Sequence, residues 1–185
     1  MAEAEAIACL RQGDIEGLAW LVERYQVKAV RVAFLIVHDD GLAREVVQTA
    51  FLRLYDRIGQ FDGERPFAPW FFRIVINDAL KTIRQHKRLD SWEEIIQSSE
   101  TALRAQLPGP EESLSQALQR EAVWQALQQL SPPERAAVVM RYYLDMSEQE
   151  MSEQLRVAPG TVKWRLHQAR QRLRELLRGE RLEAR

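Results

Sequence analysis

Residues 157–173, VAPGTVKWRLHQARQRL, gather positive charge in a chain that is nearly neutral overall. The chain of 185 residues has a formal net charge of -1, yet this segment contains Lys163, Arg165, Arg170 and Arg172 and no acid. Nucleic-acid phosphates attract cations that are clustered in this way, whatever the net charge of the whole protein. We therefore expect this segment to bind DNA.

Residue sets suited to catalysis or metal binding are absent from the sequence. His38, His86 and His167 are scattered and Cys9 is alone, so we expect neither a zinc site nor a disulfide. The sequence has no glycine-rich phosphate loop and no serine nucleophile elbow. We predict that the protein is not an enzyme and that it uses no cofactor and no metal.

Composition indicates an ordinary soluble protein, with 46% hydrophobic and 29% charged residues. The single cysteine fits a reducing compartment. The N-terminus lacks the basic and then apolar order of a secretion signal, and no apolar run approaches the roughly 20 residues that span a bilayer. We expect a cytoplasmic protein without membrane insertion.

Apolar spacing predicts helices throughout. The first two are separated at Gly13, with Asp14 as an N-cap, and the next begins at Asp39 or Asp40. Residues 60–69 contain a glycine and two prolines and predict a loop. Residues 70–88 predict a helix that begins apolar and ends basic.

Five polar residues of helix 70–88 form a single stripe, because they are spaced by four, four, three and four. They are Arg73, Asn77, Lys81, Arg84 and Arg88. Cations can follow a nucleic-acid backbone while nearby rings receive unstacked bases. This helix is therefore a candidate for binding single-stranded DNA.

An acidic segment with Pro108, Gly109 and Pro110 predicts a linker between two helical domains. We place the first domain at residues 1–89, the linker at 90–112 and the second domain at 113–185. Helices are predicted over 113–130 and from Ser131, which begins a capping box. No strand pattern is convincing, so the fold class is all-α, with two small bundles.

The second domain contains a predicted helix-turn-helix. Ser147 caps a short helix over Glu148–Leu155, a turn follows at 156–158, and a second helix opens near Pro159. With Val162 and the residues in register with it facing inward, the outer face carries the base-reading candidates Thr161, Lys163, Trp164, His167 and Gln168. Phosphate contacts are expected from Arg165, Arg170, Arg172 and Arg174.

Two alternatives apply to this face. It could be an ordinary solvated basic surface, although the capped helix and turn before it favour DNA binding. Trp164 either contacts DNA or docks on the other helices, and we favour DNA because an exposed tryptophan is costly for solubility.

Three blocks of the sequence together resemble the extracytoplasmic-function group of bacterial RNA polymerase sigma factors. They are LAREVVQTAFLRLYDRIGQF, FAPWFFRIVINDALKTIRQHKR and LQQLSPPERAAVVMRYYLDMSEQEMSEQLRVAPGTVKWRLHQARQRLREL. The likeness covers nearly the whole chain, in the family's order. It implies a transcription initiation factor that reads minus-ten and minus-thirty-five promoter elements.

The resemblance also implies partners. Core RNA polymerase would be bound through its β′ clamp coiled coil and β flap, the former by Arg44, Glu45, Gln48, Thr49 and Arg53. Promoter DNA would be bound as duplex and as melted non-template strand, and an anti-sigma factor is implied. The loop that captures a flipped base would carry Phe61, Gly63, Glu64, Arg65 and Phe67, with Asn77 facing it.

The sequence departs from the family pattern at four positions. Thr49 replaces an acid in the polymerase-binding helix, and Ser152 replaces a common alanine. Arg156 stands where glycine usually relieves a left-handed turn, so we expect a modest strain or a slightly different turn. Trp164 replaces a common serine, so the minus-thirty-five sequence it reads would be unusual.

Two other functions explain part of the sequence. A dimeric LuxR-type regulator would account for the helix-turn-helix and would bind duplex DNA unaided, but it leaves the block WFFRIVIND unexplained. A helical scaffold or anti-sigma-like protein would make no DNA contact.

Overall fold

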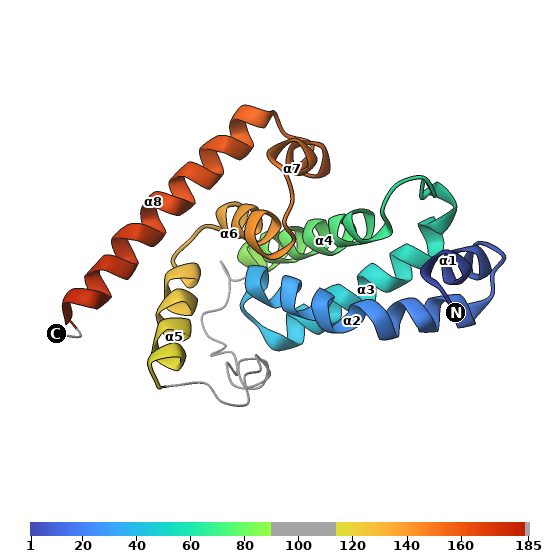
Figure 1. The fold of residues 1–185 in the computed structure, drawn as a ribbon, viewed down its shortest axis with the longest axis horizontal. Coiled ribbons are helices and arrows are strands. Elements are labelled where there is room, and N and C mark those ends of the chain that lie inside the picture. The colour runs from blue at the N-terminus through green and yellow to red at the C-terminus, as the bar shows by residue number, and fades with distance from the viewer. Residues whose placement is uncertain (90–113, 184–185) are drawn as a thin grey trace. The chain divides into compact units, whose positions relative to one another are not determined.

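The computed structural model describes residues 1–89 and 114–183, and every regular element in these ranges is helical (Figure 1). The chain divides into two units, whose described parts are these two ranges. The all-α prediction is confirmed. The predicted linker at residues 90–112 lies outside the described residues.

Unit 1 is a bundle in which α2 packs against α1, α3 and α4. Its elements are α1 (Glu3–Arg11), α2 (Ile15–Val37), α3 (Asp40–Arg57), the 3-10 helix η1 (Ile58–Gln60) and α4 (Phe67–Leu89). The Asp14 carboxylate accepts from the Glu16 N–H at 2.9 Å, so the predicted cap is confirmed. Asp39 is the cap of α3, since its carboxylate accepts from the Leu42 N–H at 2.7 Å.

Helix α4 begins at Phe67, three residues before the predicted start at Trp70. Pro69 was expected in the loop but lies in the first helical turn. Proline is tolerated there because the first N–H groups of a helix have no acceptor within the helix. The connection between η1 and α4 is therefore residues 61–66.

Aromatic side chains fill the core of unit 1 where α2, α3 and α4 meet. The ring centroids of Tyr25 and Phe67 are 5.3 Å apart, and those of Phe51 and Phe71 are 4.8 Å apart. The Phe67 and Phe71 side chains are almost completely buried. Burying such rings supplies much of the driving force for folding of this unit.

Helices α1 and α2 approach closely at Gly17, which is buried. A Cβ atom at this position would lie 2.2 Å from the Ala6 carbonyl oxygen and 2.8 Å from the Leu10 backbone nitrogen. The position is therefore restricted to glycine by space, since both neighbouring atoms belong to backbone. The approach lets α1 bury Ile7 and Leu10 against the bundle.

Unit 2 is built on α8, which packs against the other helices of the unit. Its elements are α5 (Leu114–Gln128), α6 (Pro132–Val138), the π-helix η3 (Val139–Tyr143), α7 (Glu148–Leu155) and α8 (Pro159–Glu183). The Ser131 capping box is confirmed, because the Glu134 carboxylate accepts from the Ser131 N–H at 2.8 Å. Within this unit, α7 lies at the N-terminal end of α8 (Figure 1).

We predict that Gly17→Ala destabilises unit 1 by about 1–3 kcal/mol, because the added methyl group forces α1 away from α2. Amide hydrogen exchange of α1 and α2 measures the loss. Gly59→Ala is the control, since a Cβ atom there would meet nothing within 4 Å. Equal protection in the two variants would contradict the prediction.

Candidate nucleic-acid interface

Helices α7 and α8 form the helix-turn-helix that the sequence predicts, with the predicted bounds of α7 and the predicted start of α8. The Ser147 Oγ accepts from the Glu150 N–H at 3.2 Å, and the Glu150 carboxylate accepts from the Ser147 N–H at 2.7 Å. This reciprocal capping box fixes the first residue of α7.

The turn between α7 and α8 contains a residue in the left-handed region. Arg156 has φ 52° and ψ 46°, which confirms that a non-glycine residue takes the strained position. Ser152 ties the same turn together: its Oγ donates to the Val157 carbonyl at 2.7 Å, and its own carbonyl accepts from the Val157 N–H at 3.2 Å. The hydroxyl at position 152 thus supports the turn that Arg156 strains.

The inner face of α8 is apolar, and its outer face is cationic. Val162, Leu166 and Ala169 are buried, together with Met151 of α7. The predicted DNA-binding residues divide into an exposed group, Lys163, Trp164, His167, Arg170 and Arg172, and a half-buried group, Thr161, Arg165 and Gln168. No acid occurs between Pro159 and Arg174. The structure therefore brings the predicted residues onto the N-terminal half of one helix.

Trp164 is 58% exposed on this face. It does not dock on the other helices in the described part of the chain. Lys163 is also exposed, and its Nζ lies 4.0 Å from a Glu148 carboxylate oxygen of α7. Such an exposed ion pair is weak, so Lys163 can leave it for a stronger acceptor.

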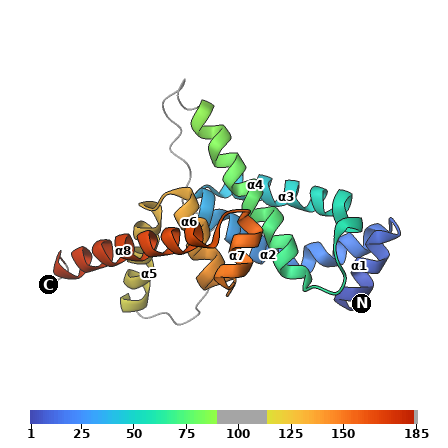
Figure 2. The same cartoon turned by 90° about the horizontal axis from the view of Figure 1, so that it is seen from above.

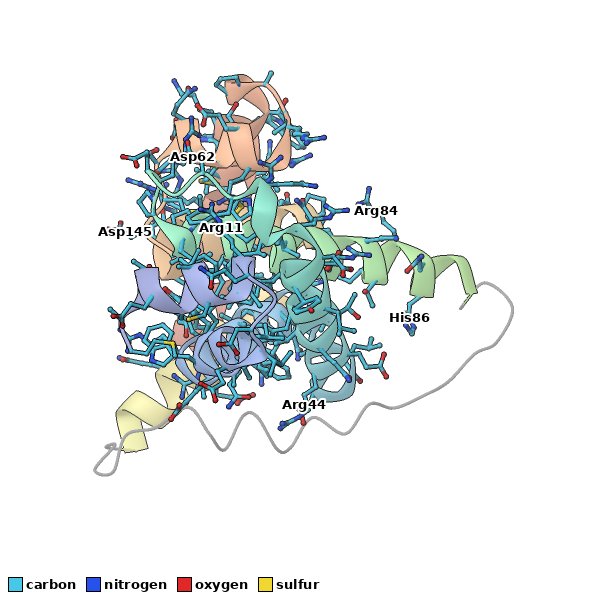
Figure 3. The ribbon with its side chains drawn as sticks, turned by 90° about the vertical axis from the view of Figure 1, so that its right-hand side faces the viewer. Arg11, Arg44, Asp62, Arg84, His86 and Asp145 are labelled. Carbon is cyan, nitrogen blue, oxygen red and sulfur yellow. The ribbon has the colours of Figure 1, made fainter. Side chains whose placement is uncertain are left out.

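Helix α4 carries the second cationic face. Asn77, Lys81 and Arg84 are exposed and Arg73 is half-buried, whereas the side chain of Arg88 lies outside the described part. The last turns of α4 project beyond the other helices of unit 1 (Figure 2). Arg84 lies on this projecting end (Figure 3). A face with this charge and position is accessible to a nucleic-acid strand.

The acid-free character of that face depends on Asp78, the only acid of α4. Asp78 is 5% exposed, and its carboxylate forms an ion pair with the Arg53 guanidinium of α3. The Arg53 side chain is 34% exposed, so its contact with a protein partner stays a prediction, but the guanidinium also has an intramolecular role. Helical spacing placed Arg53 on the outer face of α3, but its long side chain reaches α4.

The remaining predicted polymerase-binding residues lie on the surface of α3. Arg44, Glu45, Gln48 and Thr49 are exposed. Arg44 Nε donates to the Asp40 carboxylate at 3.1 Å, and Figure 3 shows Arg44 pointing away from the helix. These four side chains are accessible to a protein partner.

The loop at residues 61–66 is a turn organised by Asp62. Its carboxylate accepts from the Glu64 N–H at 3.1 Å, and its carbonyl accepts from the Arg65 N–H at 3.1 Å. Gly63, Glu64 and Arg65 are exposed, as a base-capturing loop requires. The role of Asp62 was not predicted, although the Asp-Gly pair is a turn signal.

Phe61 and Phe67 require a correction. They were predicted to face DNA, but they are only 4% and 2% exposed. Their ring centroids are 5.5 Å apart, and Phe61 also packs on Trp70 at 5.2 Å. The two rings are therefore part of the core of unit 1 at the two ends of the loop, because burying them stabilises the fold more than leaving them in water.

Comparison with known proteins identifies both units. Residues 21–89 match the family model of sigma-70 region 2, and residues 120–173 match that of sigma-70 region 4. The chain is also 30% identical over 178 residues to an RNA polymerase sigma-E factor of Streptomyces antibioticus, covering 95% of this chain and 93% of that one. The chain belongs to the extracytoplasmic-function type of the sigma-70 family. It directs RNA polymerase to promoters, and it is not an enzyme.

Other relatives agree with this assignment. The ECF sigma factor SigW of Bacillus subtilis is 28% identical over 176 residues, covering 91% of this sigma factor and 93% of SigW. The structure of the sigma factor RpoE in complex with the anti-sigma factor NepR from Bartonella quintana has a TM-score of 0.69 at 20% identity, covering 86% of this chain and 96% of RpoE. The structure of CnrH in complex with the cytosolic domain of CnrY has a TM-score of 0.66 at 22% identity, covering 97% of this chain and 99% of CnrH. These two structures share the fold of this sigma factor.

Two features are absent from residues 1–89 and 114–183. No helix there has the length and apolar character to cross a membrane. No group of three or more His, Cys, Asp or Glu side chains in these residues is arranged to hold a metal ion.

We predict that Arg156→Gly stabilises the helix-turn-helix of this sigma factor by up to about 1 kcal/mol, because glycine adopts the left-handed conformation without strain. Amide hydrogen exchange of α7 and α8 measures the change. Arg156→Ala is the matched control, since it removes the same side chain and keeps the strain. Equal stabilisation by alanine would show that strain is not the cause.

We predict an acid-sensitive contribution from the α7 cap. The hydrogen bonds from Ser147 lower the pKa of Glu150. A carboxylate whose pKa is lowered on folding stabilises the folded state fully above its unfolded value, about 4.3, and loses this effect as the pH falls through the folded pKa. The stability difference between wild type and Glu150→Gln should therefore be present at pH 7 and shrink at pH 3–4, as measured by urea denaturation. Glu153→Gln, on the same helix but outside the capping box, should show a smaller difference at pH 7.

Proposed function

We propose that this sigma factor reads two promoter elements with two separate helix faces. Unit 2 places the N-terminal half of α8 in the major groove of the minus-thirty-five element, where Lys163, Trp164 and Gln168 contact base edges. Lysine donates to guanine acceptors, glutamine pairs with adenine, and an aromatic edge packs on a thymine methyl group. Arg170 and Arg172 contact phosphates.

Unit 1 binds the melted non-template strand of the minus-ten element. Lys81 and Arg84 follow the strand's backbone, and the loop with Gly63, Glu64 and Arg65 receives a flipped base, with Asn77 close to it in the proposed complex. Extruding a base costs a few kcal/mol, which hydrogen bonding and stacking in the loop must offset. The observation that carries the whole proposal is that α4 and the first sixteen residues of α8 each present an exposed face with cations and no acid.

Core RNA polymerase is the scaffold on which both faces act. We assign the β′ clamp coiled coil to the exposed side of α3, with Arg44, Glu45, Gln48 and Thr49, and the β flap to unit 2. The polymerase works in the cytoplasm, and we place this sigma factor there. RpoE of Bartonella quintana is in complex with the anti-sigma factor NepR, which supports a partner of this kind for the present chain.

Transcription reconstituted with core polymerase tests the two faces separately. Two promoters are compared, one intact and one with a scrambled minus-thirty-five element. We predict that Lys163→Ala with Gln168→Ala, which removes two base contacts, lowers initiation about tenfold on the intact promoter and has little further effect on the scrambled one. Lys81→Ala with Arg84→Ala should lower promoter opening on both, because the minus-ten element is the same in both.

Arg178→Ala is the control, since Arg178 is an exposed cation of α8 outside the proposed DNA face. It should leave initiation on both promoters unchanged.

A gel shift completes the test: duplex promoter should be bound only with core polymerase present. Binding by the protein alone would favour a stand-alone regulator, and a uniform loss by the Lys163 and Gln168 variant on both promoters would contradict minus-thirty-five reading.

A further inference from the structure

Arg11, at the end of α1, contacts the start of the 61–66 loop. Its Nη2 donates to the Phe61 carbonyl oxygen, and its guanidinium carbon lies 6.0 Å from the centre of the Phe61 ring. A Cβ atom built on Gly63 would lie 3.8 Å from its Nη1. Figure 3 shows Arg11 between α1 and the loop that carries Asp62. One side chain therefore bonds to the base of the loop and lies near Gly63 at its tip.

The other hydrogen bonds of the loop are local. Phe61 N–H donates to the Ile58 carbonyl at 3.2 Å, and the turn at Asp62 involves residues two and three positions apart. Such bonds shape a turn without fixing its place on the bundle. The Arg11 bond joins residues fifty positions apart, and a hydrogen bond to a charged group is stronger than a neutral one.

The loop is not supported by dense packing on the side that faces α1. A cleft of about 440 Å³ lies there, lined by Ile7 and Arg11 of α1 and by Gly63, Arg65 and Phe67. Arg11 is part of the wall of this cleft and touches the loop. Removing its side chain would widen the cleft and free the loop on that side.

Helix α1, which carries Arg11, is held in place on the bundle. At its other end, Tyr25 Oη donates to the Glu3 carboxylate, which ties α1 to α2. Burial and Glu3 both raise the pKa of Tyr25, so this donor keeps its proton. Tyr25 also packs on Phe67, the first residue of α4. Arg11 therefore acts from a helix that is fixed to the rest of unit 1.

We propose that Arg11 is a positioning residue, which holds the loop at residues 61–66 in the conformation that receives the unstacked base of the melted strand. The inference rests on the proposed function of that loop and extends it to α1. Arg11 does not contact the DNA. It sets which base the loop accepts, because a loop that moves loses the fixed donors and acceptors on which selectivity depends.

The test uses the holoenzyme with Arg11→Ala and Arg11→Lys, and with Arg24→Ala as a control for loss of one exposed cation from unit 1. 2-Aminopurine at successive minus-ten positions of the non-template strand reports base flipping, and each position is also substituted to measure base preference. We expect Arg11→Ala to slow opening about tenfold and to reduce the preference at one position about tenfold. Arg11→Lys, which retains a donor but lacks the planar fork, should fall between alanine and wild type. Arg24→Ala should behave as wild type.

Salt dependence separates positioning from a phosphate contact. A positioning residue leaves the slope of log affinity against log salt unchanged, whereas loss of one phosphate contact lowers its magnitude by about one. A reduced slope for Arg11→Ala together with full recovery by Arg11→Lys would overturn the proposal. Hydrogen exchange of α1 shows whether this helix stays in place in Arg11→Ala. If the alanine variant displaces α1, the base preference of Arg11→Lys tests the proposal instead.

Glu64→Ala and Arg65→Ala distinguish this proposal from the function on which it rests. Where these loop variants lose base preference and Arg11→Ala keeps it, the inference about Arg11 is wrong and the function of the loop stands. Where neither the loop variants nor Arg11→Ala change base preference, the loop does not capture a base, and both proposals fall.

Discussion

The ion pair between Asp78 and Arg53 determines what unit 1 can present to a nucleic acid. A buried carboxylate without a cation is strongly unfavourable, and losing one partner of such a pair costs about 3–5 kcal/mol. Asp78 is 5% exposed, and Arg53 reaches it from α3. The pair therefore fixes α4 against α3 in one orientation. In that orientation the only acid of α4 is turned inward, so that Lys81 and Arg84 act without an opposing charge.

Unit 2 also presents cations on a face without acids, but it does so by placing its charges on different helices. Three acids lie on the eight residues of α7, whereas the first sixteen residues of α8 carry none. The turn between the two helices keeps the charges apart, but it places Arg156 in the left-handed region at a cost of about 1 kcal/mol. Ser152 offsets part of this cost with its bond to the Val157 carbonyl. The strained turn is therefore retained by local hydrogen bonding.

Local signals were sufficient to predict α7 to the residue, because Ser147 and Glu150 cap it and Pro159 opens the next helix. Contacts between distant parts of the chain could not be predicted in this way. Helical spacing placed Arg53 at the surface, and only the packing of α3 on α4 brings it to Asp78. The prediction was wrong for Phe61 and Phe67, which were assigned to an exposed loop, because nothing local indicates that Phe67 packs on Tyr25 of α2 or that Phe61 packs on Phe67. The predicted loop extended too far, to Pro69, for another reason: proline is typical both of loops and of first helical turns.

Two weak faces on separate units have a functional advantage. The chain has a net charge of -1, so it lacks the general cationic field that holds basic proteins on any DNA. In the complex proposed above, each face offers only a few cations and base contacts, too few for tight binding of either element alone. Once polymerase holds both units, binding of one element raises the effective concentration of the other face near its own site. Selectivity then requires both elements at the correct spacing. A more basic sigma factor would bind DNA more tightly and lose this discrimination, because phosphate contacts do not depend on sequence.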